Sequence, residues 1–215
     1  MGEDKYQVIK VHVVIPGNMQ DIHHWTGSAR LVEEIAAEVS NGNPLTTRVF
    51  LYPWHANWRR VATRIWWLGE YHQKRVAVNI YGYSWGGGWG SKRLAYELSW
   101  LGVDVHNMTL ADPIYRHWYP LGNWRVFTNH WSLKWLFGDL PIKIPCNVKR
   151  VRWTRQQVSY PRAHKLVADC ESTIIDTPEL LNVSHLVMDE HPAYHRLALE
   201  AARSLHSDTE LEVQN

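Results

Sequence analysis

Hydrophobic and polar residues follow two periods along the chain. Segments rich in β-branched residues predict strands at 8–16, 46–54, 76–81, 103–111 and 148–155. Segments whose apolar positions recur every three to four residues predict helices at 29–39, 57–73, 91–101 and 193–205. Strands separated by helices need crossover connections, so the pattern predicts an α/β fold with a mostly parallel sheet of about five or six strands and helices on both faces.

One stretch interrupts this alternation. Residues 114–144 are rich in Trp, Tyr and Phe and have only weak periodicity. We predict that they form a Trp-rich insert or lid within a single domain spanning residues 1–215. Whether these rings line a pocket or cover the core stays open at this stage. Four further Trp residues lie on or beside periodic segments and are interpreted as structural: Trp54, Trp58, Trp66 and Trp67.

Composition narrows the possible partners. Hydrophobic residues make up 45 % of the chain and charged residues 20 %, as in ordinary globular proteins, which argues against disorder. The 23 Lys and Arg residues nearly balance the 21 Asp and Glu residues, so net charge indicates neither a nucleic acid nor an acidic membrane surface as partner. The basic stretch Lys149–Arg155 alternates with apolar residues, which favours a strand at a solvated sheet edge over a nucleic-acid site. Oligomeric state is not indicated.

Localisation rests on two weak signals. Cys146 and Cys170 are the two cysteines, too few for a disulfide framework, so we expect free thiols. The first residues lack the features of a signal peptide, and no window approaches eighteen uninterrupted apolar residues. These observations predict a cytoplasmic protein without a membrane span.

The strongest chemical signal is the sequence Gly82-Tyr83-Ser84-Trp85-Gly86. It matches G-x-S-x-G and stands between a predicted strand and a predicted helix, where this motif exposes a serine hydroxyl on a tight turn. The small residues at either end permit close backbone approach. Ser84 is therefore the candidate nucleophile. The alternative is a glycine-rich turn that serves only strand-to-helix packing.

An activated serine needs a base and an acid that orients it. Asp112 directly follows the strand at 103–111, at the edge where the carboxyl ends of parallel strands meet, so it is the candidate acid; Asp176 is its main rival. His185 lies just before the last helix and is the candidate base. His191 and His195 are spaced like metal ligands, but no third ligand has a fitting spacing, so we interpret them as surface-helix residues.

The transition state of acyl transfer also needs hydrogen-bond donors for the oxyanion. The backbone N–H of Trp85, directly after Ser84, is the first candidate. The second is the backbone N–H of Asn18, in the turn after the first strand. An ordinary turn at Gly17 and Asn18 is the alternative interpretation.

Four segments carry a resemblance to the lipase and esterase branch of the α/β-hydrolase superfamily. They are VVIPGN after the first strand, IYGYSWGGG at the serine, TLADPIYR at the acid and VSHLVMDEHPAYH at the base. The resemblance implies a minimal α/β-hydrolase fold and ester or thioester hydrolysis with no metal and no cofactor. It favours His185 over His191 as the catalytic base and implies that Asp189 is a supporting residue of the loop that carries this base. The chain lacks the His-Gly pair that many relatives carry after the first strand.

The sequence therefore predicts a serine hydrolase that cleaves small-molecule carboxylic esters through an acyl-enzyme on Ser84. A thioesterase, lactonase or amidase on the same three residues stays open, because the pocket walls decide substrate choice. A non-catalytic binding protein on a hydrolase scaffold, with exposed Trp as its interaction surface, is the alternative from a different class.

Overall fold

The computed structural model describes residues 8–18, 26–39, 46–114 and 141–212. Its main sheet has seven strands in the order β2-β1-β3-β4-β6-β8, and β9 also pairs with β6. Every pairing in this sheet is parallel. The strands are β1 (Ile9–Ile15), β2 (Thr47–Leu51), β3 (Val76–Tyr83), β4 (Val105–Ala111), β6 (Val148–Gln156), β8 (Ile174–Ile175) and β9 (Glu179–Leu181). The predicted α/β fold with a mostly parallel sheet is confirmed.

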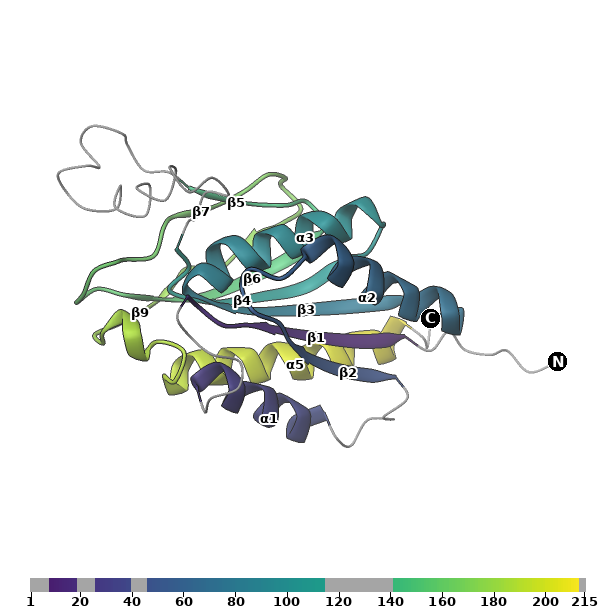
Figure 1. Ribbon diagram of the computed structural model, residues 1–215, viewed down its shortest axis with the longest axis horizontal. Helices are drawn as coiled ribbons and strands as arrows, with labels where there is room; N and C mark the ends of the chain where they lie inside the picture. Colours follow the sequence, from purple (N-terminus) through teal and green to yellow (C-terminus); the bar gives the residue numbers. More distant parts are fainter. Residues whose placement is uncertain (1–7, 19–25, 40–45, 115–140, 213–215) are drawn as a thin grey trace.

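Helices cover both faces of the sheet (Figure 1). One face carries α2 (Trp58–His72) and α3 (Ser91–Trp100), and the other carries α1 (Gly27–Val39) and α5 (Pro192–Glu212). A short π-helix, η1 (Gly86–Gly90), joins β3 to α3, and a 3-10 turn, η3 (His185–Val187), precedes α5. None of the described helices is long and apolar enough to cross a membrane.

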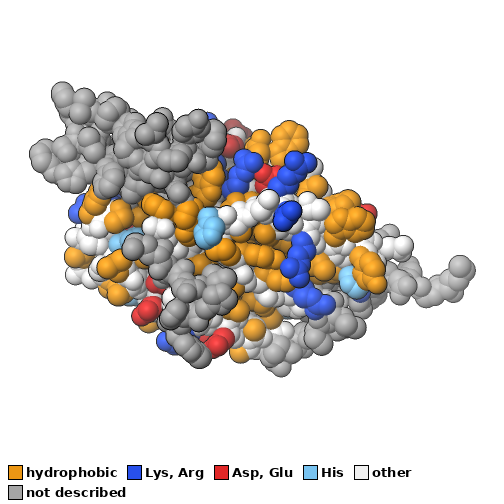
Figure 2. All heavy atoms as spheres, viewed as in Figure 1, with side chains coloured by type: hydrophobic (Ala, Val, Ile, Leu, Met, Phe, Trp, Pro, Cys, Tyr) orange, Lys and Arg blue, Asp and Glu red, His pale blue; other side chains and the backbone are white. Residues whose placement is uncertain are grey.

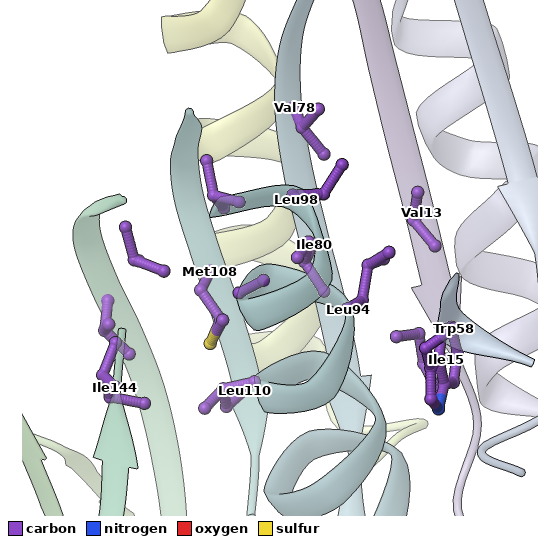
Figure 3. Packing of buried hydrophobic residues seen from close by; sticks show 14 of the residues in the cluster. Val13, Ile15, Trp58, Val78, Ile80, Leu94, Leu98, Met108, Leu110 and Ile144 are labelled. Carbon is purple, nitrogen blue, oxygen red and sulfur yellow. The ribbon is translucent and has the colours of Figure 1, made fainter. Parts of the chain in front are cut away.

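Two buried clusters hold these layers together. Strand residues such as Val13, Ile80 and Met108 pack against Leu94 and Leu98 of α3 (Figure 3). On the opposite face, a second cluster joins the sheet to α1 and α5; it includes Val14, Leu31, Ile35, Tyr81, Ala198 and Ala202. Strands β1, β3 and β4 are buried almost continuously, because their side chains face helical layers on both sides. Their parallel pairing brings their carboxyl ends to one edge of the sheet.

The structure differs from the predicted elements in three places. β8 and β9 have two and three residues, too few to give a periodic signal. β6 lies between β4 and these two short strands, so the predicted sheet edge at 148–155 is wrong. Residues 115–140 of the predicted insert lie outside the described residues, and its last three residues form β5 (Ile142–Ile144), which pairs with β7 (Leu166–Ala168).

Two interpretations of single side chains are also corrected. Cys146 and Cys170 are not free thiols but form a disulfide, with their Cα atoms 5.3 Å apart. The bond joins the chain after β5 to the chain after β7, and it removes one of the two supports for a cytoplasmic location. Trp58 is buried as expected of a structural residue, but Trp67 is 57 % exposed.

Candidate active site

Ser84 lies directly after β3, at the sheet edge where the carboxyl ends of the strands meet. Its φ is +53°, in the left-handed region that non-glycine residues rarely adopt. Two glycines permit the sharp turn. A Cβ at Gly82 would collide with the Ser91 hydroxyl and the backbone of η1, and a Cβ at Gly86 would collide with carbonyl oxygens at the end of β1. Both glycines therefore permit the tight strand-to-helix turn on which Ser84 lies.

The loop after β1 packs directly on this turn. A Cβ at Gly17 would lie 2.9 Å from Cβ of Ser84 and 2.9 Å from the ring of Tyr83. Asn18, the next residue, is exposed. The loop that carries the predicted second oxyanion donor is therefore adjacent to Ser84, whereas the role of the Asn18 N–H itself stays a prediction.

A helix begins directly after the serine. Trp85 has right-handed helical backbone angles, and the chain continues through η1 into α3, where the Ser91 hydroxyl donates to the carbonyl of Gly86 over 2.9 Å. The first N–H groups of a helix have no intrahelical acceptor and form its positive end. The Trp85 N–H belongs to this first turn, so the local field there favours a developing negative charge.

His185 contacts both other predicted residues. Its Nε2 lies 3.0 Å from Oγ of Ser84, and its Nδ1 lies 2.6 Å from Oδ2 of Asp112. A carboxylate only accepts, so Nδ1 donates to Asp112 and Nε2 is left to accept the serine proton. All three side chains are buried: Ser84 and His185 are each 6 % exposed and Asp112 is 0 % exposed.

Asp112 is held by the backbone of a segment that sequence analysis passed over. Its Oδ1 accepts from the backbone N–H of Gln156 over 3.2 Å and of Ala163 over 3.0 Å. With the Nδ1–H of His185, three donors stabilise the carboxylate. Because the donors at Gln156 and Ala163 are backbone groups, no side-chain motif marks them in the sequence.

The Gln156 side chain orders the loop that supplies these donors. Its amide nitrogen donates to the carbonyls of Ser159 and Pro161, each over 2.8 Å, and its oxygen accepts from the Ser159 N–H over 2.8 Å. The Ser159 hydroxyl in turn accepts from the His185 N–H over 2.8 Å. The buried Gln156 thus connects the backbone that holds Asp112 with the backbone that holds His185.

The other candidates have different partners. Asp176, the rival acid, receives two hydrogen bonds from Nε of Arg150 over 3.0 and 3.1 Å. His191 Nδ1 accepts from the Ala193 N–H at the start of α5. His195 is 6 % exposed, so its interpretation as a surface residue is wrong.

His195 bridges two elements. Its Nδ1 lies 2.6 Å from Oε2 of Glu34 on α1, and its Nε2 lies 2.7 Å from the carbonyl oxygen of Asp189. Asp189 also accepts from the Ser28 N–H, at the start of α1, over 3.2 Å. Asp189 therefore connects the segment after His185 to the start of α1. The described residues contain no group of three or more His, Cys, Asp or Glu side chains that could hold a metal ion.

Comparison with known proteins adds little to this geometry. No protein-family model matches the sequence, and no curated protein matches it. Among solved structures, the chain is similar to RedJ, a thioesterase from the prodiginine biosynthetic pathway in Streptomyces coelicolor. The similarity covers 91 % of this chain and 85 % of that chain, with 11 % sequence identity and a TM-score of 0.44.

Proposed function

We propose that this chain is a serine hydrolase of the α/β-hydrolase type that cleaves carboxylic esters through an acyl-enzyme on Ser84. The observation that carries the proposal is the continuous set of contacts from Ser84 Oγ through the His185 imidazole to the Asp112 carboxylate. This is the arrangement in which a base takes a serine proton and an acid fixes its tautomer. The left-handed backbone at Ser84 is a second, independent support.

The proposed reaction has two halves. Ser84 Oγ attacks the ester carbonyl carbon while His185 Nε2 takes its proton, and the N–H groups of Trp85 and Asn18 stabilise the oxyanion. The intermediate collapses, the carbon–oxygen bond to the alcohol breaks, and the imidazolium returns the proton to the leaving oxygen. Water then attacks the acyl-enzyme with His185 as base, which releases the acid and restores Ser84.

The test is hydrolysis of short- and medium-chain p-nitrophenyl esters by wild type and Ser84→Ala. We expect turnover to fall at least about a thousandfold in the variant, because the covalent route is lost. Ser99→Ala is the matched control: Ser99 is exposed at the far end of α3, where its hydroxyl donates to the Tyr96 carbonyl. Circular dichroism must show all three proteins folded.

A fluorophosphonate probe separates a selective enzyme from a non-catalytic protein. Labelling at Ser84 without ester turnover would leave the activated serine in place and direct the search to thioesters, lactones and amides. Absence of both labelling and turnover in folded wild type would overturn the proposal and favour a binding protein on this scaffold.

A further inference from the structure

Helices α2 and α3 expose four large aromatic side chains. Trp67 and Tyr71 on α2 are 57 % and 79 % exposed, and Tyr96 and Trp100 on α3 are 41 % and 73 % exposed. Each pair is separated by four residues and so shares one side of its helix. The two helices contact each other and cover the same face of the sheet (Figure 1). Their outward surface, here called the α2–α3 face, therefore carries all four rings.

The same surface is basic. Within the sequences of α2 and α3 there are five Lys or Arg residues and two Asp or Glu residues, whereas α1 on the opposite side has one Arg and three Glu residues. In the described part of the chain, the exposed Arg59, Arg60 and Arg64 have no carboxylate partner. Figure 2 shows Lys and Arg side chains beside hydrophobic ones over these helices. The net charge of the whole chain is near zero, so its composition does not show that basic residues gather on α2 and α3.

The ring geometry indicates which kind of anionic partner fits. Trp66 and Trp67 meet edge-to-face at 67°, and Tyr96 and Trp100 meet at 80°. The Arg93 guanidinium lies over the ring of Tyr96, 5.3 Å from its centroid. Because these rings pack edge-to-face or lie under a guanidinium, they do not form a row of open ring faces on which nucleotide bases could stack. Exposed Trp and Tyr mixed with long cationic side chains instead suit the headgroup layer of a bilayer.

A cleft of about 420 Å³ continues this surface toward the serine. It lies between the N-terminal parts of α2 and α3, and its lining includes Arg59, Trp54, Trp89 and the ion pair between Arg93 and Glu97, whose N–O distance is 2.6 Å. The Trp54 ring also packs edge-to-face on the ring of Trp85, with centroids 5.3 Å apart. Because Trp85 directly follows Ser84, the cleft links the α2–α3 face to the sheet edge that carries the candidate nucleophile.

We propose that the α2–α3 face docks on a bilayer containing anionic phospholipids, with a headgroup phosphate beside Arg59 in the cleft. Arginine recognises phosphate by charge and by its planar donors, and the aromatic rings supply apolar contact below the headgroups. Docking does not depend on the proposed hydrolysis, since none of its residues belongs to the Ser84, His185 and Asp112 set. It would bring the candidate active site to the membrane surface.

The experiment is flotation of the full chain with vesicles of phosphatidylcholine alone or with about 30 % phosphatidylserine. We expect binding to the anionic vesicles at about 0.1 M salt and loss of most of it at about 0.5 M. Arg59→Gln combined with Arg60→Gln is expected to weaken binding roughly tenfold or more, because each cation contributes separately. Trp67→Ser combined with Trp100→Ser is expected to weaken it by a similar factor.

Matched controls come from another part of the surface. Ile174 and Leu180 are 56 % and 55 % exposed, and Ile174→Ser with Leu180→Ser should leave binding unchanged. Lys149→Gln with Lys165→Gln is the charge-matched control on exposed residues. Absence of vesicle binding by wild type would overturn the proposal. So would equal losses in the face and control variants, or binding to polyuridylate at a salt concentration where vesicles do not bind.

Discussion

Tyr83 donates its hydroxyl proton to the carbonyl oxygen of His185 over 2.8 Å, and its ring stacks on that imidazole with centroids 5.2 Å apart. The residue before the candidate nucleophile thus positions the candidate base. Burial, followed by the negative charges of Asp189 and Asp112, raises the pKa of the Tyr83 phenol well above its usual range. The phenol therefore stays protonated near neutral pH and can donate to the His185 carbonyl.

Tyr83→Phe should lower kcat several-fold and leave KM for short esters nearly unchanged. The ring and its packing remain, but the His185 carbonyl loses its donor, which costs about 1–2 kcal/mol of unfolding free energy for a buried group. Steady-state kinetics with p-nitrophenyl esters and urea denaturation measure the two effects. Tyr71→Phe on the exposed end of α2 is the control. Unchanged kcat in Tyr83→Phe would show that this hydrogen bond does not position the base.

Asp112→Asn separates the two candidate acids. An amide facing Nδ1 of His185 favours the wrong tautomer, so turnover should fall about a thousandfold or more while the fold persists. Asp176→Asn should keep wild-type turnover, because that carboxylate contacts Arg150 and lies on the surface. Comparison of kcat for the two variants is the measurement. The opposite ranking would assign the acid to Asp176.

Residues of the candidate site that have a local sequence signal could be predicted, and groups brought together only by the fold could not. Ser84 was predictable because the constraint is local: glycines two positions on either side and a strand-to-helix transition. Asp112 and His185 were predictable from their places after a strand and before a helix. The donors at Gln156 and Ala163 were not, because they are backbone groups brought near Asp112 by the fold.

Long-range partners explain the wrong interpretations. The bond between Cys146 and Cys170 depends on the adjacency of β5 and β7, two three-residue strands with no periodic signal. His195 is buried by Glu34, 161 positions away in the chain. Trp67 lies on α2 outside the buried stripe formed by Trp58, Val61, Ala62, Ile65 and Gly69, and the sequence alone does not show where that stripe ends.

A buried histidine far from the serine should make stability depend on pH. His12 is fully buried, and its Nδ1 lies 2.9 Å from the hydroxyl of Tyr81. Burial, followed by the charges of His206 and Lys10, lowers the pKa of His12 from 6.5 to about 3. Between about pH 3 and pH 6.5, the unfolded chain therefore binds a proton at His12 that the folded chain does not. The contribution of His12 to the free energy of unfolding is full above about pH 6.5 and is lost as the pH falls toward 3.

We expect the protonation of His12 in the unfolded chain to lower the free energy of unfolding by roughly 1 kcal/mol for each pH unit below pH 6. His12→Gln should be less stable at pH 7, because the packing around Tyr81 changes, but its stability should fall less steeply with acid. Urea denaturation at pH 7, 6 and 5 gives both slopes. His72→Gln, at an exposed position on α2, should keep the wild-type slope. Parallel curves for wild type and His12→Gln would contradict the assignment.

The ring of His195 has an oxygen acceptor beside each nitrogen, so it bridges two elements. The Asp189 carbonyl can only accept, so Nε2 carries a hydrogen. Burial alone would raise the pKa of Glu34, but its hydrogen bonds and ion pairs with His195 and Arg30 lower it. Through these two contacts the His195 ring ties α1 to the segment following His185.

Urea denaturation and steady-state kinetics of His195→Gln and Glu34→Gln with p-nitrophenyl esters test whether this bridge positions the segment that carries His185. His195→Gln keeps one contact and loses the other, so we expect about 1–3 kcal/mol less unfolding free energy and a lower kcat at unchanged KM. Glu34→Gln should reduce kcat in the same direction, because both changes loosen the tie between α1 and the segment that carries the base. Wild-type stability in both variants would contradict the bridge itself. Stability losses in both variants without any change in kcat would restrict this bridge to a structural role.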